Sequence, residues 1–491
     1  MISTHPKAMG VRYRTSEIYQ ELGLLDEIKE GSLPLEGRSL AFWAKSLVGE
    51  ELGEVALHDT TTPFSPATVL HCPQTWVEQV LLEAVQREAL VEIRFDAEVA
   101  SVTQDGSLAT VNLADGGVLT ASWVVAADGA GSRIRKALDI GTEGPGDMGH
   151  FINTLFRAPY GRRMEDRKSL LYQSLSDEYF EAFVAVNGDD LWLMHHFLQP
   201  GETAADFSAE KMKEIIQYTS GMPEEPVEVL GMSPWVMSPK VAKQWRAGRI
   251  LLTGDASARL SPAGGLGLNT GLQSVHNLAW KLALVVKGEA SELLLDTYQQ
   301  ERQGVAFWLM SNTNRNAEEL MTIIASAMRG DWDHVRQMIA HSRRGGAGLG
   351  QDLGISYEQG AFLPDGTSAP VVADVVNDYV PIARPGSRAP HIPIRCGDTE
   401  KSTLDLFGEG FCVLAGKAGG AWRQKSEGLG FYENGAEFEA ADLEEVYGIE
   451  SDGAVVIRPD GYVAARFTSY RPDLAGPAEV VKNLLRSETR A

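Results

Sequence analysis

The sequence has little positive charge, few cysteines and no long hydrophobic run. Lys and Arg number 44 against 67 Asp and Glu, which gives a formal net charge of −23. This excess of negative charge argues against nucleic acid or an anionic membrane as a partner. No apolar run reaches the length needed to cross a bilayer, and the first residues lack the pattern of a signal peptide. We therefore expect neither a membrane span nor a nucleic-acid partner.

The three cysteines, Cys72, Cys396 and Cys412, are scattered and form no CxxC or metal-ligand spacing. This usage is typical of a reducing cytoplasm, and no His/Cys cluster indicates a metal site. A length of 491 residues predicts two to four domains, and an apolar content of 44% is enough to build their cores.

A further absence is the unit that usually holds the ADP half of a dinucleotide cofactor, a first strand followed by GxGxxG and a helix. The one literal GxGxxG, Gly144–Gly149, contains a proline, follows no strand directly and opens no convincing helix. We interpret it as a loop at a domain boundary. The glycine cluster at 345–350 does not have the required spacing.

The most informative segment is RILLTGDASARLSPAGGLGLNTGLQSVHNLAWKLALVVKG, Arg249–Gly288. It predicts a buried strand at Ile250–Thr253, a break at Gly254-Asp255 and a Gly/Pro-rich loop at Ser261–Gly267. A helix follows, with Gly288 as a C-terminal cap. Its apolar residues alternate steps of three and four and are Leu272, Val275, Ala279, Leu282 and Val286.

This order of elements suits a large polar cofactor. The Asp255 carboxylate can accept hydrogen bonds from sugar or ribityl hydroxyls, and glycines let a ring lie against bare backbone. The N–H groups at a helix start favour negative charge, which a reduced flavin carries at its N1–C2 edge. The alternative is an ordinary strand–loop–helix crossover with a glycine-tolerant loop.

The segment resembles the GD motif of the group A flavin monooxygenases, the para-hydroxybenzoate hydroxylase family. The matching residues are Gly254, Asp255, Pro262, Gly264, Gly265, Gly267, Asn269 and the run Asn277-Leu278-Ala279-Trp280-Lys281-Leu282. The sequence departs from the family pattern at Ala258, often a His, at Ser261, usually a Pro, and at Ser274, commonly an Asp.

A second segment, WVVAADGAGSRIRKAL (Trp123–Leu138), predicts an apolar strand, a sharp turn and a basic helix start. A strand ending in Asp-Gly is a common turn. Beside the GD motif, however, the segment resembles the family's DG motif. That resemblance implies that Asp128 and Gly129 lie near the flavin and that Arg135 matches the family's Arg.

Two weaker matches lie earlier in the chain. HCPQTWVEQVLLEAV, from His71, resembles the segment in which a family Gln meets the flavin, and Gln74 stands there. The start, THPKAMGVRYRTSEIYQELGL, resembles the loop and helix after the family's second strand, with Lys7 where an Arg is usual. Both side chains could equally be exposed polar residues without a cofactor role.

The middle of the chain changes character, because YFEAFVAVNGDDLWLMHHF predicts two strands joined around Asn187-Gly188. The resemblance implies an inserted, sheet-based substrate domain here. On the second strand His196 shares a face with Trp192 and Met194, whereas His195 shares the other with Leu193 and Phe197. Either histidine is a candidate acid or base, or a structural residue. Which face meets the substrate stays open.

The C-terminal part carries no independent catalytic set. STLDLFGEGFCVLAG and GAVVIRPDGYVAARF resemble the thioredoxin-like domain of phenol and polyketide hydroxylases, without the redox CxxC. Cys412 is then a small apolar residue on a buried strand, in a structural or interface-forming domain. LLLDTYQQERQGVAFWLM resembles a characteristic D-x-Y-x-x-E-R stretch of the family. We interpret this segment as a plain amphipathic helix.

The resulting fold class is α/β plus α+β, an FAD-binding Rossmann-like fold of the para-hydroxybenzoate hydroxylase type. We expect it to be N-terminally truncated by one βαβ unit of about 30–40 residues, through the gene model or as a natural variant. The expected domains are 1–145 and 233–345 for the two parts of the FAD-binding domain, 146–232 for the substrate sheet and 350–491 for the thioredoxin-like domain.

The resemblance implies a hydroxylase that uses FAD, NAD(P)H and O2, with a C4a-hydroperoxyflavin attacked by a phenolic or polycyclic aromatic substrate. Asp255 would hold the ribityl chain, the Leu266–Asn269 backbone the anionic reduced ring, and Pro262 the cavity beside it. The expected cofactor-binding residues are Lys7, Gln74, Asp128, Gly129, Asp255, Pro262, Gly265, Leu266, Gly267, Leu268 and Asn269. No side chain is identified as the catalytic base.

Two other functions stay open. One is a non-catalytic homologue that does not retain FAD, and the other is a flavin oxidoreductase or epoxidase that acts on a non-aromatic substrate. The expected partner is a small aromatic substrate, and a homodimer is one possible assembly.

Overall fold

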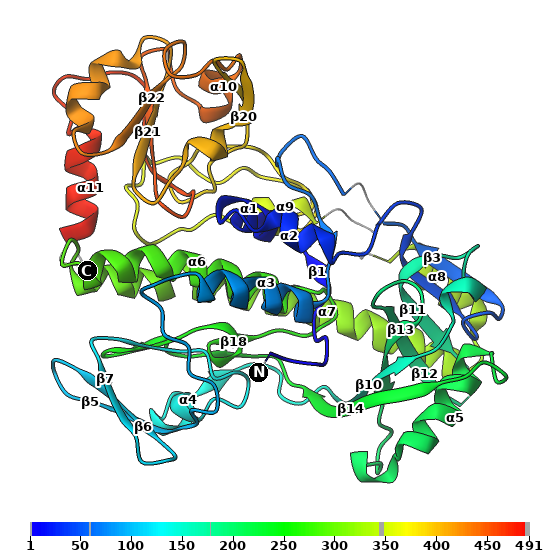
Figure 1. Cartoon of the computed structure of the whole chain (residues 1–491). Helices are drawn as coiled ribbons and strands as arrows, with labels where there is room; N and C mark the ends of the chain where they lie inside the picture. The colour runs from blue at the N-terminus through cyan, green and yellow to red at the C-terminus, as the bar shows by residue number, and fades with distance from the viewer. Residues whose placement is uncertain (1, 58–59, 177, 343–347, 487–491) are drawn as a thin grey trace.

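The computed structural model describes residues 2–57, 60–176, 178–342 and 348–486. Two long helices, α6 (Gly267–Val286) and α7 (Asp296–Met328), run through the centre of the molecule. Figure 1 shows the C-terminal domain on one side of these helices and a large sheet at the far end of α7. None of the described helices is both long and apolar enough to span a bilayer.

The part of the fold that carries the DG and GD motifs is built on a short parallel pair. β8 (Val124–Ala126) lies parallel to β17 (Ile250–Leu252), whose three residues are fully buried. The expected strand before Gly254-Asp255 is therefore confirmed. β16 (Arg246–Ala247) covers one edge of the pair, and no described strand pairs with β8 on the other edge.

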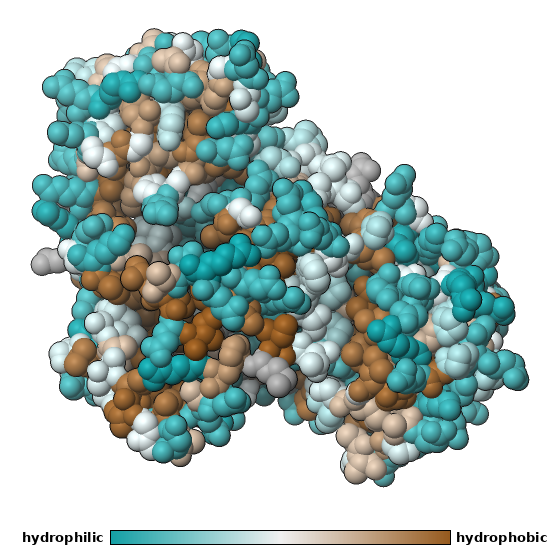
Figure 2. Space-filling view, viewed as in Figure 1, coloured by the Kyte–Doolittle hydropathy of each residue, from teal (hydrophilic) through white to brown (hydrophobic). Residues whose placement is uncertain are grey.

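The remaining elements of this part are short strands and helices. The strands are β1 (Gly10–Val11), β4 (Leu70–His71), β5 (Val99–Gln104), β6 (Ala109–Leu113), β7 (Val118–Ala121), β9 (Thr142–Glu143), β15 (Lys240–Ala242) and β18 (Ala258–Arg259). The helices are α1 (Tyr13–Glu21), α2 (Leu25–Glu30), α3 (Gln74–Gln86) and α4 (Arg133–Ala137). Exposed apolar side chains occur on and near β7, and apolar residues are visible over this region in Figure 2.

The middle of the chain forms a seven-stranded sheet in the order β14-β10-β13-β12-β11-β2-β3. The strands are β2 (Ser39–Ala44), β3 (Glu51–Val55), β10 (Gly149–Arg157), β11 (Ser169–Leu175), β12 (Phe180–Ala185), β13 (Leu191–Phe197) and β14 (Glu228–Met237). β12 and β13 form the hairpin expected around Asn187-Gly188, with Gly188 in the left-handed region at φ +73. The sheet also includes β2 and β3, which lie outside residues 146–232. The expected domain boundaries stay a prediction.

The two faces of this sheet have different neighbours. One face packs on α5 (Ala209–Ser220) in an apolar core that includes Phe156, Trp192 and Met194. The opposite face carries Phe151, Phe197, Trp235 and Met237, which pack with Ala263 of the glycine loop and Ala317 of α7. The face that bears His195 therefore lies toward the GD motif, and the face that bears His196 lies away from it.

The helix after the GD motif forms as expected, but its buried side is not the predicted apolar stripe. Val275 and Val286 are 42% and 61% exposed, whereas the buried positions include Ser274, Asn277 and Lys281. Tertiary contacts decide which side of α6 is buried, because polar residues of α7 and of the C-terminal domain pack against Ser274, Asn277 and Lys281. The cap is confirmed: Gly288 has φ +73 and the N–H of Glu289 bonds the carbonyl of Leu284.

The C-terminal domain contains the sheet β22-β21-β23-β24 and the hairpin β19–β20. Its strands are β19 (Pro393–Cys396), β20 (Thr399–Ser402), β21 (Cys412–Ala415), β22 (Gly430–Glu433), β23 (Ala454–Ile457) and β24 (Val463–Phe467). Its helices are α10 (Leu443–Tyr447) and α11 (Pro477–Arg486). In the chain, α7 is followed by α8 (Trp332–Ala340), which packs against β3, and then by α9 (Leu349–Leu353), before the C-terminal domain begins.

A buried ion cluster joins α6, α7 and the C-terminal domain. Glu301 of α7 accepts hydrogen bonds from Lys281 at 2.8 Å and from both terminal nitrogens of Arg458 at 2.8 Å. Asp460 pairs with the same guanidinium, and Asn277 donates to both carboxylates. The four charged side chains are 0–1% exposed. Two cations thus face two anions, so the cluster compensates its own charge.

The cluster gives a structural role to three α6 residues that matched the family pattern, Asn277, Trp280 and Lys281. This role does not involve the cofactor. Trp280 lies under the Arg458 guanidinium at 5.2 Å and against the Phe411 ring, so it too contacts the C-terminal domain. Burial favours neutral carboxyls here, but Arg458 and Lys281 together hold the pKa of Glu301 below its usual value. Within the run Asn277–Leu282, Asn277, Trp280 and Lys281 thus form an interdomain contact, whereas Leu278 and Leu282 pack in the core around β17.

A second buried ion pair ties the first helix to the same domain. Glu17 of α1 accepts hydrogen bonds from Arg388 and Arg14, and from the Ser65 hydroxyl at 2.6 Å. Arg14 also donates to the carbonyl of Asp460 at 2.7 Å, which connects the two clusters.

We expect Glu301→Gln to lower the free energy of unfolding by about 3–5 kcal/mol, because it leaves buried cations without their carboxylate. Denaturant unfolding followed by circular dichroism measures this loss. Glu318→Gln, at an exposed position of the same helix, is the matched control and should change stability by less than about 0.5 kcal/mol. Equal stability of the two variants would contradict the structural role of the cluster.

Candidate functional site

The DG and GD motifs meet because their strands are neighbours. The N–H of Thr253 bonds the carbonyl of Ala126, which brings the ends of β8 and β17 together. Arg135 then bridges the two turns, donating to the carbonyl of Ala256 at 2.9 Å and to that of Ala130 at 3.3 Å. Arg135 is thus a buried structural link between the motifs rather than a free cation.

Asp255 lies shortly after the end of β17. Its side chain is accessible and has no hydrogen-bond partner among the described residues. Desolvation by neighbouring protein nevertheless raises the pKa of this carboxyl, while Arg259 and Lys7 act in the opposite direction. A carboxylate that is reachable, partly desolvated and unpartnered is suited to accept hydrogen bonds from the hydroxyls of a bound molecule.

The glycine loop offers bare backbone beside this carboxylate. Gly265 has φ +65, a conformation that disfavours other residues, and no atom lies within 4 Å of the position a side chain would occupy. Gly254 and Gly267 likewise have no atom within 4 Å of the position a side chain would occupy. Because the N–H groups of Gly267, Leu268 and Asn269 begin α6, they have no partner within the helix and donate to no described residue.

Asn269 has a structural task in addition to its place at the helix start. Its side-chain oxygen accepts the N–H of Arg12 at 2.9 Å, and its side-chain nitrogen donates to the carbonyls of Gly10 and Gly265. The side chain therefore clamps the glycine loop against β1. Leu266 is buried, whereas Pro262 and Leu268 are more accessible.

The other expected residues lie at the same end of the molecule. The N–H of Gln74 bonds the carbonyl of Ala8, next to Lys7, and the Gln74 side chain donates to Glu78 at 2.6 Å. Lys7 is exposed and close enough to Asp255 to influence its pKa. Asp128 accepts the N–H of Ile134 at 3.1 Å, and Gly129 has φ +77.

This set of groups fits a flavin. The open space beside three glycines, the unpaired helix N–H groups and the unpartnered Asp255 match a flat ring with a polyhydroxyl chain. The loop at 144–149 is not part of it, since β10 begins at Gly149 and no helix follows. Among the described residues, no three His, Cys, Asp or Glu side chains are placed to bind a metal ion.

Sequence reasoning named His195 and Phe197 of the sheet face that lies toward the loop, but it missed Phe151, Asn153 and Trp235 as site residues. Phe151 and Trp235 stack with their ring centroids 4.5 Å apart, and Asn153 lies beside them. The available signal was the alternation along β10, which places Phe151, Asn153 and Leu155 on one face.

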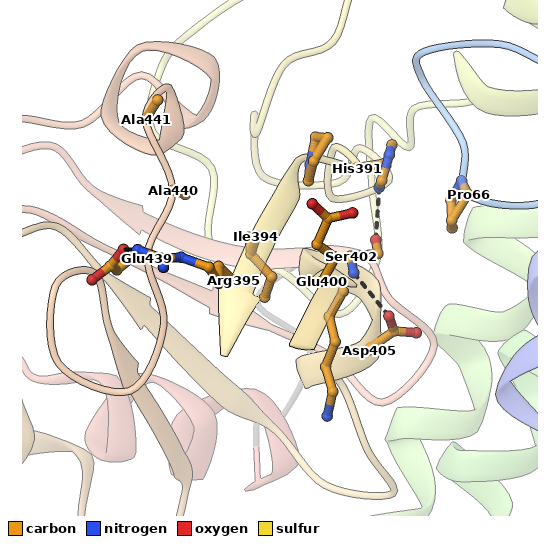
Figure 3. Close-up of a pocket in the computed structure, with 12 residues that line it drawn as sticks. Pro66, His391, Ile394, Arg395, Glu400, Ser402, Asp405, Glu439, Ala440 and Ala441 are labelled. Atoms are coloured by element: carbon orange, nitrogen blue, oxygen red, sulfur yellow. Dashed lines mark hydrogen bonds and ion pairs between the residues drawn. The ribbon is translucent and has the colours of Figure 1, made fainter. Parts of the chain in front are cut away.

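A cavity of about 570 Å³ lies elsewhere, in the C-terminal domain near Pro66 (Figure 3). Its Ser402 hydroxyl is 2.7 Å from a ring nitrogen of His391, but it also accepts the N–H of Leu404, and Asp405 accepts the N–H of Ser402. Ser402 is only 2% exposed. This reciprocal pattern is a helix cap, so the serine is not an activated nucleophile.

Comparison with known proteins agrees with this geometry. Residues 2–313 match the FAD binding domain family, and residues 383–486 match the aromatic-ring hydroxylase C-terminal domain. The chain belongs to the FAD-binding aromatic-ring hydroxylases. It is an FAD-dependent monooxygenase, and NAD(P)H is the reductant typical of this family.

Relatives are similar over nearly their whole length. A putative polyketide hydroxylase of Streptomyces halstedii is 34% identical and covers 99% of this chain and 89% of the relative. Tetracenomycin A2 monooxygenase-dioxygenase of Streptomyces glaucescens is 31% identical over 96% of this chain and 88% of the relative.

Among solved structures, the flavin-dependent monooxygenase PieE in complex with FAD and substrate has a TM-score of 0.92 at 27% identity. That match covers 99% of this chain and 93% of PieE. A ternary complex of aklavinone-11 hydroxylase with FAD and aklavinone has a TM-score of 0.85 at 29% identity, covering 99% and 92%. These matches confirm the mixed α/β flavin-monooxygenase fold.

We expect only Cys396 to react rapidly with DTNB in the folded protein. Burial raises the pKa of Cys72 to about 11 and that of Cys412 to about 12, which removes the reactive thiolate. Counting thiols before and after denaturation should therefore give one fast thiol and then three. Rapid labelling of Cys412 in the native state would contradict its assignment as a buried, redox-inactive residue.

Proposed function

We propose that this monooxygenase hydroxylates a polycyclic phenol of the polyketide type, held between the glycine loop and the Phe151–Trp235 face of the sheet. The observation that carries the proposal is the aromatic character of that face, where Phe151 stacks on Trp235 and meets Phe197 edge-on. Flat apolar rings bind well to such surfaces through area burial and offset stacking.

The relatives support a polycyclic substrate. Their names include polyketide, tetracenomycin and aklavinone hydroxylases, and also a 2,4-dichlorophenol 6-monooxygenase with a single-ring substrate. The overall reaction would consume NAD(P)H, O2 and one proton and yield NAD(P)⁺, water and the hydroxylated ring.

The cofactor roles that we propose follow from the site. Asp255 accepts hydrogen bonds from the ribityl chain, and the N–H groups of Gly267, Leu268 and Asn269 hold negative charge at the pyrimidine edge of the ring. Gly265 and Leu266 supply backbone that the ring can approach, and Pro262 borders the substrate space. The surrounding residues Lys7, Gln74, Asp128 and Gly129 complete the proposed set.

When bound, FAD takes electrons from NAD(P)H and activates O2 for transfer of one oxygen atom to the substrate ring. The residues of this chain orient the ring and exclude water from it. We propose that the aromatic sheet face does both, next to its contact with Ala263 of the loop. We also propose a reducing cytoplasm as the compartment, in keeping with three free cysteines.

We expect Asp255→Ala to weaken FAD binding by about 10- to 100-fold, because hydrogen bonds to a charged acceptor are lost. Flavin absorbance retained after desalting and a fluorescence titration with FAD measure the change. The circular dichroism spectrum should stay that of the parent protein. Asp398→Ala, in the exposed turn of β19–β20, is the control and should bind FAD like the parent. Stoichiometric flavin in Asp255→Ala would contradict the assignment.

The proposed substrate class is tested by NAD(P)H oxidation in the FAD-loaded protein with and without a hydroxyanthraquinone. We expect the phenol to stimulate oxidation and to be recovered one oxygen atom heavier. Stimulation only by a non-aromatic alkene would favour an epoxidase instead. No retention of FAD by the parent protein would favour the non-catalytic alternative.

A further inference from the structure

One strand, β13, carries two adjacent histidines on opposite faces of the sheet. His196 lies in the core behind the sheet, where its Nδ1 is 2.6 Å from Glu181 and its ring packs on Phe207. It is 2% exposed, and its other nitrogen is buried without a partner. His195 lies on the face toward the glycine loop and is only partly buried.

Asn153 holds the His195 ring in place. Its side-chain oxygen is 2.6 Å from His195 Nδ1 and also accepts the indole N–H of Trp235. The three residues lie on adjacent strands, since Asn153 is directly opposite His195 in the β10–β13 register. Asn153 is therefore the centre of a small polar network on an otherwise aromatic face.

This network determines which nitrogen of His195 carries the proton. An indole N–H can only donate, so the Asn153 atom that it contacts must be the amide oxygen. An amide oxygen can only accept, so the His195 Nδ1 that shares this oxygen must carry a hydrogen. In the neutral ring the remaining nitrogen, Nε2, is then a lone-pair acceptor, and it has no hydrogen-bond partner among the described residues.

The surroundings keep this ring neutral. Burial, together with His5, lowers the pKa of His195 to about 4, and its cross-strand neighbours Asn153 and Ala182 carry no charge. His5, from the N-terminal segment, is the titratable group that acts on it, and Lys7 acts in turn on His5. Nε2 is thus available as a base at neutral pH.

We infer that His195 is the base that deprotonates the phenolic substrate, with Asn153 and Trp235 as positioning residues. The inference rests on the proposed function and chooses between the two histidines that the sequence offered as candidate acids or bases. As the oxygen atom is transferred to the ring, the phenolic O–H bond breaks and an Nε2–H bond forms, so the developing phenolate makes the ring carbon more electron-rich and His195 becomes an imidazolium. Asn153 continues to accept the Nδ1–H.

The first test compares the parent protein with His195→Gln, loaded with FAD, using a hydroxyanthraquinone as the probe. Because a ring with a pKa of about 4 takes the proton only as oxygen is transferred, both proteins should bind the probe as the neutral phenol at neutral pH, which its visible spectrum checks. His195→Gln should turn over about 10²-fold more slowly. Its rate should recover as the pH rises and the probe ionises in solution, and its FAD titration should match that of the parent.

The second test uses Asn153→Asp, which keeps the shape and the acceptor but adds a negative charge. A carboxylate beside the ring favours imidazolium and raises the His195 pKa. Because only neutral His195 acts as a base, kcat/KM should fall on acidification at a higher pH than in the parent, whose profile should stay flat down to about pH 5. His150→Gln, at an exposed position of β10 on the opposite face, is the matched control and should leave the profile unchanged.

Turnover equal to that of the parent, with an unchanged pH profile, in His195→Gln would overturn the assignment and leave the proposed function intact. A pH profile that does not move in Asn153→Asp would also overturn it. A parent protein that neither binds nor oxidises the probe would overturn both the assignment and the proposed substrate class.

Discussion

The Glu301 carboxylate is the point on which the arrangement of this molecule depends. It lies on α7 where this helix meets α6 and the turn between β23 and β24, and it accepts hydrogen bonds from Lys281 of α6, from Arg458 of the turn and from the N–H of Ala361. A buried carboxylate is tolerated only when its charge is matched and its lone pairs are used. Both conditions are met only if the C-terminal domain stands against the two helices. The helix α6, which follows the glycine loop, is therefore held from behind by a domain that contributes none of the proposed cofactor-binding residues.

The elements around the motifs were predictable from the sequence because their information is local. The apolar run before Gly254-Asp255, the glycines after it and the capping Gly288 each determine backbone conformation within a few residues. The hairpin at Asn187-Gly188 is predictable for the same reason. The cofactor-binding residues themselves stay a prediction, although the structure brings the Asp128 turn and Asp255 together.

Other features depend on contacts between distant residues and could not be predicted. Arg458 meets Glu301 across a separation of 157 residues, so nothing near Asn277 or Lys281 indicates that the polar side of α6 is the buried one. The same holds for β2, which joins the middle sheet by pairing in parallel with β11. The role of Asn153 required the register between β10 and β13, which alternation alone cannot supply.

The alternation of side chains in the β10–β13–β14 region has a consequence for how such an enzyme can evolve. Residues such as Phe151, Asn153 and His195 face the loop, while their chain neighbours Ile152 and His196 belong to the core behind the sheet. Substitutions on the proposed substrate face can therefore leave the residues of the core behind the sheet unchanged. Residues of the proposed substrate face and residues of the core behind the sheet alternate along the same strands. Selection can therefore change the first set while it keeps the second.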